Sequence, residues 1–313
     1  MKLKTGDTVL IIATARCVIE NDIVSFLTWA EAKGLKVELA PNLFAVENQF
    51  AGSDQQRAQD LIWALSHPKA SAVFCARGGY GTIRTIRELE KIIESSAEWH
   101  ESLESLMTSQ WKHKLFVGFS DVTVLHSWLN RFNWVSVHGP VVTQWSLTDF
   151  SKTLNSLEIA LFEGLVELDV QDCFMLNAKP FSGKLVGGNL SLMYALLATP
   201  YRINTVNTVL ILEDLDEYLY HLDRMMQTLD LSGALSNIQA LIVGGMSEMK
   251  DNPTSFGHSA FDIIHQVVSK YSIPVIFDVQ IGHLSTNNSV FMGASITFDG
   301  RYLLQSINPQ DNA

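Results

Sequence analysis

The stretch LFVGFSDVTV, at residues 115–124, places a serine where an apolar run stops. A strand that turns sharply into a helix lifts the side chain of its turn residue above the sheet, and Gly118 leaves space for a tight turn. Ser120 would then be an exposed nucleophile, and the backbone N–H of Asp121 would lie at a helix N-terminus, where negative charge is stabilised. Taken alone, the decapeptide favours a simpler interpretation, in which Ser120 or Asp121 only caps the helix.

A serine nucleophile needs a base, and the base needs an orienting carboxylate, because a hydroxyl is a weak nucleophile at its own pKa. His283 follows a strand and Gly282 in the polar loop VQIGHLSTNN. The apolar strand in VLILEDLDEY ends with Glu213 and Asp214, although these two acids can also simply cap the next helix. Ser120, Glu213 and His283 therefore follow the order nucleophile, acid, base. Chain order alone proves little, since such triads recur in several orders.

A second motif, ARGGYGTIR at residues 76–84, has a strand, a glycine-rich turn and a helix in succession. It lacks the Gly-Lys-Ser/Thr of a P-loop, and Arg84 stands where the G-x-G-x-x-G pattern needs its last glycine. Nucleotide binding is therefore disfavoured. The N–H groups of the turn, Gly79 among them, can instead form half of an oxyanion site beside the serine. The alternative is a plain connection between strand and helix.

The first half of the chain alternates short β-rich runs with longer segments of helical period. The runs are TVLIIA at 8–13, KVEL at 36–39, AVFCA at 72–76 and LFVGF at 115–119, and the helical segments lie at about 20–33, 54–66, 81–95 and 121–131. Strands this uniformly apolar are covered on both faces, which predicts an α/β domain with a parallel sheet. Ligands of such sheets bind at the carboxyl ends of the strands.

The second half predicts a smaller mixed domain in which strands outnumber long helices. Strands are predicted at 183–187, 208–214, 240–245, 274–279 and 289–300, with a helix opened by Asn189 and further helices at about 217–229 and 258–270. A chain of 313 residues is long enough for two domains. We expect an α/β nucleophile domain at 1–148, a linker region at 149–180 and a C-terminal domain with the acid and base at 181–313. A polar excursion at about 92–114 precedes the fourth strand.

Composition restricts the partners of the protein. The formal net charge is −11, which would repel a phosphate backbone, so nucleic acid is not an expected partner. No apolar run reaches about 18 residues and no secretory signal opens the chain, so we expect no membrane span and a cytoplasmic protein. The three cysteines fit a reducing compartment. No metal-ligand spacing is present, and we expect neither a metal nor a cofactor.

Six ordered blocks, spread over nearly the whole chain, carry a family resemblance. They are RGGYG at 77–81, GFSD at 118–121, HGP at 138–140, GGNLSLM at 187–193, LEDLDEYLYHLDRMMQTL at 212–229 and GH at 282–283. Together they resemble the LD-carboxypeptidase family of serine peptidases, the muropeptide carboxypeptidases, which also includes microcin-immunity peptidases. The resemblance implies a flavodoxin-like or class I amidotransferase-like sheet domain followed by a smaller swivelling β/β/α domain, and a homodimer.

The resemblance also implies roles for individual residues. Ser120 would be the nucleophile, Glu213 the orienting acid and His283 the base, and the backbone amides of Asp121 and Gly79 would form the oxyanion hole. One departure lies at the end of the first strand, where relatives usually have Pro-Ser or Pro-Ala and this chain has Thr14, Ala15 and Arg16. That departure leaves the local shape there open, but does not touch the triad.

The implied reaction is release of terminal D-alanine from the L,D bond to meso-diaminopimelate in murein tetrapeptides, during cell-wall recycling. The terminal carboxylate suits an arginine fork, for which Arg77 and Arg224 are candidates, although each can instead form a structural ion pair. One alternative is a microcin-immunity peptidase that cleaves an aminoacyl-nucleotide amide, with Trp111 or Trp145 as a platform for the base. The other alternative is a non-catalytic protein that binds a small molecule, with Ser120 only a cap.

Overall fold

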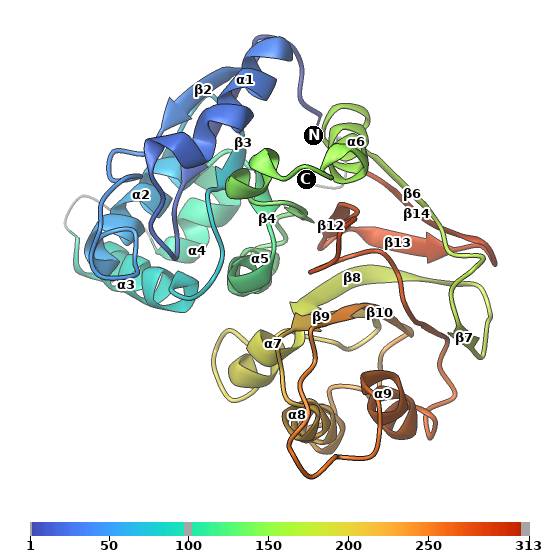
Figure 1. The fold of residues 1–313 in the computed structure, drawn as a ribbon. Coiled ribbons are helices and arrows are strands. Elements are labelled where there is room, and N and C mark those ends of the chain that lie inside the picture. Colours follow the sequence, from blue (N-terminus) through green and yellow to red (C-terminus); the bar gives the residue numbers. More distant parts are fainter. Residues whose placement is uncertain (1, 97–101, 308–313) are drawn as a thin grey trace.

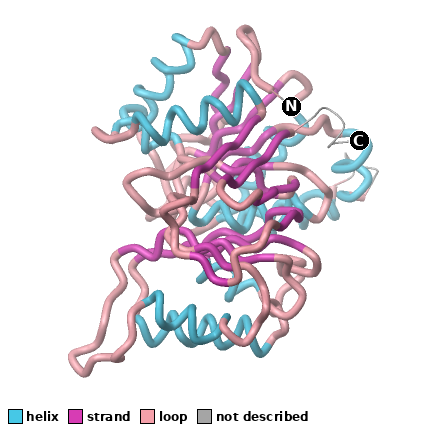
Figure 2. Tube along the Cα trace, turned by 90° about the vertical axis from the view of Figure 1, so that its right-hand side faces the viewer, coloured by secondary structure: helices cyan, strands magenta, loops and turns pink. Residues whose placement is uncertain are grey.

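Two β-sheets, each flanked by helices, organise the chain (Figure 1). The computed structural model describes residues 2–96 and 102–307. Residues 97–101, part of the predicted excursion at 92–114, lie outside the described residues. The tube view in Figure 2 shows the two sheets stacked between outer layers of helices. This is the mixed α/β architecture with two sheet domains that the sequence predicted.

The first sheet carries the strand that precedes Ser120. Its strand order is β12-β5-β4-β3-β1-β2, in which β1 to β5 run parallel and β12 is antiparallel to β5. The strands are β1 (Thr8–Ile12), β2 (Lys36–Leu39), β3 (Ala70–Cys75), β4 (Leu115–Gly118), β5 (Ser136–His138) and β12 (Val290–Met292). The register pairs Gly118 with His138, so the carboxyl ends of β4 and β5 lie side by side.

Helices on both faces of this sheet explain why its central strands are apolar at every position. β1 and β4 are buried throughout, as a strand covered on two sides must be. The helices are α1 (Val24–Ala32), α2 (Asp54–Ser66), α3 (Thr82–Ser95), α4 (Leu103–Ser105) and α5 (Thr123–Asn130). α2 begins at a capping box, in which Ser53 and Gln56 bond each other's backbone N–H groups, and this fixes the start predicted for that helix.

The second sheet carries Glu213. Its strand order is β6-β14-β13-β8-β9-β10-β11-β7, with β8 to β11 parallel and the other strands antiparallel to their neighbours. The strands are β6 (Leu165–Asp169), β7 (Met175–Leu176), β8 (Phe181–Asn189), β9 (Thr208–Leu215), β10 (Ala240–Ser247), β11 (Val275–Ile276), β13 (Ser295–Phe298) and β14 (Tyr302–Ser306). The helices α7 (Leu190–Leu196), α8 (Leu219–Leu231) and α9 (Ala260–Val268) cover its outer face (Figure 1).

Two segments connect the sheets more closely than a simple linker would. Residues 149–180 contain α6 (Ser151–Glu158) and the strands β6 and β7 of the second sheet. β6 is an edge strand in which Val166 is buried while its neighbours are more exposed, a pattern too weak to predict from periodicity.

The run at 289–300, expected as one strand, divides at Gly293 into β12 of the first sheet and β13 of the second.

The two sheets share one hydrophobic core. A single cluster of buried side chains joins Phe74 and Val117 of the first sheet to Leu185, Ile211 and Ile296 of the second. The relative position of the two domains is thereby fixed by packing, and with it the position of side chains that each domain presents to the other. No helix in the described segments has the length and apolar character needed to cross a membrane.

Candidate active site

Ser120 occupies a strained turn between β4 and α5. Its φ angle is 63°, in the left-handed region that residues other than glycine rarely adopt, and it opens a short 3-10 helix over Ser120–Val122 that leads into α5. A Cβ atom at Gly118 would lie 2.9 Å from the Val122 side chain and 3.1 Å from Cys75 Cβ, so the turn requires glycine there. A serine in a strained turn between a strand and a helix has the geometry of a nucleophile elbow. The sequence around Ser120 matches the G-x-S-x-G pattern of such elbows only in part.

The predicted acid and base are in direct contact. His283 Nδ1 lies 2.6 Å from Glu213 Oε2, and the backbone N–H of His283 donates to the same oxygen over 3.2 Å. Glu213 lies on β9 and is fully buried. Because Nδ1 of His283 is hydrogen-bonded to the Glu213 carboxylate, its Nε2 is free to accept a proton. The general base of a catalytic triad requires this arrangement.

Gly282 makes this contact possible. Its φ angle is 99°, and a Cβ atom there would lie 2.5 Å from Glu213 Oε2 and 2.7 Å from Glu213 Cγ. The N–H of Gly282 donates to Asn287 Oδ1 over 2.8 Å, which holds the loop in place. The glycine before the histidine is therefore a steric requirement of the acid–base pair.

The electrostatics of Glu213 favour its ionised form. Burial alone would raise the pKa of this carboxyl, but the imidazoles of His138 and His283 outweigh burial and lower the pKa to about 2. Glu213 is accordingly a carboxylate at neutral pH, and it can both orient His283 and stabilise the positive charge that the imidazole gains when it takes a proton.

Ser120 and His283 face one pocket of about 180 Å³ at the carboxyl end of the first sheet. Phe119 forms part of its wall, with its ring centroid 4.6 Å from that of His283. Within the described segments no hydrogen bond joins the Ser120 hydroxyl to His283. Such bonds are often long before a substrate is bound. The structure thus brings the predicted acid and base into a hydrogen bond, and places the serine and the base around the same cavity.

The glycine-rich turn passes directly beside the serine. A Cβ atom at Gly78 would lie 3.1 Å from Ser120 Cβ and 3.2 Å from its hydroxyl oxygen. Gly79, with a φ angle of 105°, also lines the pocket, and its N–H makes no backbone hydrogen bond in the part of the chain that the structure describes. The turn therefore has the position that the predicted oxyanion donor needs.

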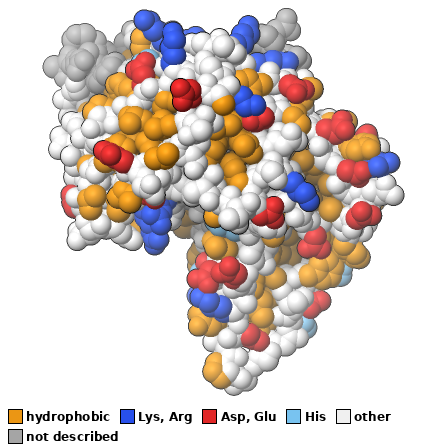
Figure 3. All heavy atoms as spheres, turned by 45° about the horizontal axis from the view of Figure 1, so that its top comes forward, with side chains coloured by type: hydrophobic (Ala, Val, Ile, Leu, Met, Phe, Trp, Pro, Cys, Tyr) orange, Lys and Arg blue, Asp and Glu red, His pale blue; other side chains and the backbone are white. Residues whose placement is uncertain are grey.

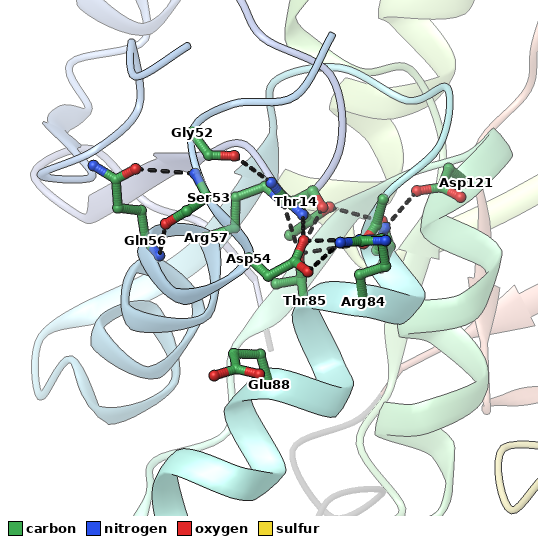
Figure 4. A network of polar contacts seen from close by, with 12 residues as sticks. Thr14, Gly52, Ser53, Asp54, Gln56, Arg57, Arg84, Thr85, Glu88 and Asp121 are labelled. Atoms are coloured by element: carbon green, nitrogen blue, oxygen red, sulfur yellow. Dashed lines mark hydrogen bonds and ion pairs between the residues drawn. The ribbon is translucent and has the colours of Figure 1, made fainter. Parts of the chain in front are cut away.

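The side chain of Asp121 ties the serine turn to the glycine-rich turn. Its Oδ2 accepts the backbone N–H of Thr82, the first residue of α3, over 2.8 Å (Figure 4). Burial raises the pKa of Asp121, and the bond to Thr82 opposes this shift. The carboxylate of Asp121 therefore has a structural role, because it holds together the two turns that surround the pocket.

A polar network behind these turns connects them to α2 (Figure 4). The Thr85 hydroxyl donates to the carbonyl oxygen of Thr14 over 2.9 Å, and Arg57 Nε donates to the Thr85 hydroxyl over 3.0 Å. Arg57 is 1% exposed and also pairs with Asp54, which bonds Arg84 as well. The buried guanidinium therefore joins α3 to the start of α2, and Thr85 joins α3 to the residues after β1.

The arginines predicted to hold a carboxylate lie in different places. Arg77 lines the pocket, and its guanidinium donates a long hydrogen bond of 3.5 Å to the Cys17 carbonyl oxygen. Arg224 lies on α8 with its guanidinium 5.3 Å from the Tyr220 ring centroid, and it does not line the pocket. Arg16, which sequence reasoning did not propose, does line it. In the sequence Arg16 stood out only as part of the Thr14-Ala15-Arg16 departure after the first strand, and no role was predicted for it.

A second histidine approaches the acid from the other side. His138, at the end of β5, is fully buried, and neither ring nitrogen has a hydrogen-bond partner among the described residues. Its Nε2 lies 4.0 Å from Glu213 Oε1, which is also buried and unpartnered. Two buried polar atoms left without partners are costly, and a shift of about 1 Å would join them. In the sequence, His138 appears only as the first residue of the HGP block, and no role was predicted for it.

Replacing His138 by leucine is expected to lower kcat about 10- to 100-fold, because the buried Glu213 carboxylate loses the polar imidazole 4.0 Å from its Oε1. KM should change little, because His138 does not line the pocket. Without His138 the pKa of Glu213 should rise, because one of the two imidazoles that lower it is gone, so the acidic limb of the kcat/KM profile should move to higher pH. Steady-state kinetics between about pH 5 and 9 measure both effects.

Glutamine at position 138 is the matched control, because its amide nitrogen can donate to Glu213 from about the place of Nε2. It should restore much of the lost kcat and return the acidic limb toward its original position. A leucine variant with unchanged kcat and pH profile, or a glutamine variant no better than leucine, would show that His138 only fills space.

The chain is similar to known proteins over nearly its whole length. Sequence models of the LD-carboxypeptidase N-terminal and C-terminal domains match residues 9–139 and 182–298. A probable murein peptide carboxypeptidase of Bacillus subtilis (strain 168) is 30% identical over 93% of this chain and 88% of its own. The structure of muramoyltetrapeptide carboxypeptidase from Oxalobacter formigenes superposes with a TM-score of 0.79 and 26% identity, over 95% of this chain and 97% of that one.

The microcin C7 self-immunity protein MccF has the same fold, with a TM-score of 0.81 to 0.82 over 98% of both chains, at 15% identity. The two domain matches together span most of the chain, and the Bacillus relative extends the match across the region between them. The protein therefore belongs to the LD-carboxypeptidase family.

Proposed function

We propose that the protein is a serine carboxypeptidase that releases terminal D-alanine from the L,D bond of murein tetrapeptides in cell-wall recycling. Ser120 is the nucleophile, His283 the base and Glu213 the orienting acid. The observation that carries the proposal is the 2.6 Å bond between His283 and a buried, ionised Glu213, at a pocket shared with a serine in a strained turn. Murein peptides are named as the substrate of the Bacillus relative, and a muramoyltetrapeptide as that of the Oxalobacter enzyme.

The geometry supports an acyl-enzyme mechanism. His283 Nε2 takes the proton of the Ser120 hydroxyl as its oxygen attacks the carbonyl before the terminal residue. The backbone N–H groups of Asp121 and Gly79 receive the oxyanion. His283 then gives its proton to the departing amine of D-alanine, and water, activated by the same imidazole, releases the acyl group from the serine.

Two arginines without carboxylate partners give the pocket its preference for an anionic substrate. Arg16 and Arg77 both line it, and within the described residues neither forms a salt bridge. Arg16 packs on the glycine-rich turn, where a Cβ atom at Gly79 would lie 2.6 Å from Arg16 Cδ. A carboxypeptidase must hold the free carboxylate of its substrate, and a guanidinium does so with two parallel hydrogen bonds. Arg16 and Arg77 are the groups that we assign to that carboxylate.

Replacing Arg16 by alanine is expected to raise KM for a tetrapeptide about 10- to 100-fold with a smaller change in kcat, because the carboxylate is bound in both ground and transition states. Initial rates of D-alanine release at varied substrate concentration measure this split. The same substitution at Arg224 should leave KM unchanged, since that side chain lies outside the pocket. Equal effects of the two substitutions would contradict the assignment, as would an unchanged KM in the Arg16 variant.

The microcin-immunity alternative has the fold in its favour, and one MccF structure contains glutamyl sulfamoyl guanosine. The two tryptophans proposed as a base platform do not support it. Trp111 is 9% exposed, and Trp145 is 8% exposed and packs against Phe26, Trp29 and Phe150. Both are core side chains, and neither lines the catalytic pocket. We therefore favour a murein peptide as the substrate.

A direct comparison of substrates tests the proposal. The protein is incubated separately with a murein tetrapeptide ending in D-alanine, with the same peptide ending in L-alanine, and with an aminoacyl sulfamoyl adenosine, and the products are identified by mass spectrometry. We expect loss of alanine from the first compound only. Cleavage of the sulfamoyl nucleoside alone would favour the immunity function. No cleavage of any compound, together with no labelling of Ser120 by a fluorophosphonate, would favour the non-catalytic binding protein.

We also propose, from the family resemblance, that the enzyme works in the cytoplasm as a homodimer. The face drawn in Figure 3 shows apolar side chains gathered between scattered charges of both signs. On the neighbouring elements at residues 19–24 and 142–147, the apolar side chains of Ile19, Val24 and Leu147 are each more than half exposed. Light scattering after size-exclusion chromatography measures the oligomer, and a mass of 34.9 kDa at all concentrations would contradict the dimer.

A further inference from the structure

A second cavity lies where the two domains meet, apart from the catalytic pocket. It encloses about 270 Å³ and is lined by the end of α5, by β8, by the loop after α7 and by the turn between β12 and β13. None of its lining residues lines the catalytic pocket. Its volume exceeds the roughly 150 Å³ that accommodates benzene and approaches the lower end of ordinary small-molecule sites.

The lining of this cavity has a charge opposite to that of the whole protein. Arg131 from the first domain and Lys184 and Arg202 from the second all line it, and no carboxylate does. The complete chain has 33 acidic and only 22 basic residues. Three cations gathered around one cavity in an acidic protein repel each other and lower the energy of an anion placed among them.

These cations have few competing partners. Lys184 Nζ makes a 3.4 Å contact with Asn133 Oδ1, and it has no salt bridge among the described residues. Arg131 forms a 3.8 Å ion pair with Glu90, too long for a hydrogen bond, and its guanidinium lies 5.7 Å and 5.8 Å from the ring centroids of Phe132 and Tyr201. Most donors of the three cationic groups therefore remain available to a ligand.

An unpartnered amide adds a neutral donor. Asn130 Nδ2 is buried and has no hydrogen-bond partner among the described residues, although Asn130 lines the cavity. A Cβ atom at Gly293 would lie 2.4 Å from this nitrogen, so only glycine leaves the amide room there. A buried N–H₂ group without an acceptor is costly, and an anionic oxygen in the cavity would supply one.

We propose that this cavity binds a small anion with two or more charges, of the phosphate ester or pyrophosphate class. Guanidinium groups bind phosphate oxygens through paired, charge-assisted hydrogen bonds, and lysine and asparagine complete the set of donors. The ligand contacts both domains at once, through Arg131 on one side and Lys184 and Arg202 on the other. Binding therefore stabilises the domain junction.

The cavity is physically connected to the catalytic serine. α5 begins directly after the Ser120 turn, and its residues His126, Ser127 and Asn130 line the cavity. His126, in the middle of α5, lines the cavity and bonds the carbonyl oxygen of Gly118 at 2.9 Å, two residues before the serine. Because Ser120 comes from the first domain and His283 from the second, a ligand that holds the domains together also holds these two side chains together.

Isothermal titration of the intact protein with pyrophosphate, at constant ionic strength, tests the proposal. We expect one site with a dissociation constant below about 1 mM, and a rise in melting temperature that grows with pyrophosphate concentration. Citrate in a parallel titration distinguishes a preference for phosphate oxygens from binding of any polyanion, and binding of citrate alone would overturn the phosphate class. No saturable binding of pyrophosphate up to 10-fold above that concentration would overturn the site.

Lys184→Gln and Arg202→Gln locate the site. Each removes one exposed or partly exposed cation and should weaken binding about 10-fold or more, the effect of losing one charge-assisted contact. Lys36→Gln on β2, at the far edge of the first sheet, removes the same charge elsewhere and should leave binding unchanged. Equal weakening in all three variants would indicate a general charge effect and overturn the proposal. Circular dichroism checks that each variant is folded, and none of these measurements depends on peptidase activity.

Discussion

Replacing Ser120 by alanine is expected to lower kcat for the tetrapeptide by roughly 10⁴- to 10⁶-fold. The nucleophile is lost, while the pocket, the buried acid and the base remain in place. Any residual rate would come from the oxyanion donors and from substrate binding. Release of D-alanine over hours, followed by mass spectrometry, covers this range, and the melting temperature of the variant should stay close to that of the parent protein.

The control for this substitution is Ser95→Ala. Ser95 is an exposed residue in the last turn of α3, with its hydroxyl bonded to the Lys91 carbonyl oxygen, and it has no contact with the pocket. Its loss should leave kcat unchanged. If the Ser120 variant kept more than about a tenth of the parent activity, far above the residual rates of triad knockouts, the serine would not be the nucleophile.

Gly282→Ala should produce the next largest loss, about 10²- to 10⁴-fold in kcat. The new methyl group would lie 2.5 to 2.7 Å from atoms of Glu213, so either the carboxylate or the loop must move. Either movement breaks the bond between Glu213 and His283, and the imidazole then loses its orientation and its compensating charge. The left-handed backbone at this position adds strain of about 1 to 3 kcal/mol. Thermal unfolding and steady-state kinetics on one preparation measure both effects.

Gly300→Ala separates the effect of contact with Glu213 from the effect of backbone strain. Gly300 has a φ angle of 110°, close to the 99° of Gly282, but a Cβ atom there would meet nothing within 4 Å. It should show the backbone strain as a lower melting temperature while kcat stays unchanged. A Gly282 variant with normal kcat, or a Gly300 variant that loses as much activity, would mean that contact with Glu213 does not explain the requirement for glycine.

The predictions that succeeded depended on local patterns. The strand–turn–helix sequence around Ser120 and the apolar strand ending at Glu213 could be read directly, because the chemistry lies at strand ends of a predicted parallel sheet. The structure places both there and adds the bond to His283. The catalytic roles of these residues stay predictions until the substitutions above are measured.

The positions of Arg16, His138 and Arg224 relative to the pocket could not be predicted, because they depend on which strands and helices become neighbours in the fold. Arg16 reaches the pocket because β1 and β3 are adjacent, and His138 reaches Glu213 because the two domains pack face to face. Arg224 seemed equally suited to bind a carboxylate, but the direction of α8 carries it away from the pocket. Sequence spacing contains no information on such long-range neighbours when only one chain is available.

The position of β12 in the first sheet also determines when that sheet can be completed during translation. β12 pairs with β5 in antiparallel register, with Val290 opposite His138, and it follows every other strand of the first sheet in the chain. During translation the half that holds Ser120 would therefore leave the ribosome with one sheet edge open and without its base. Under the proposed mechanism, a chain that stops before residue 283 carries Ser120 but lacks the base proposed to activate it.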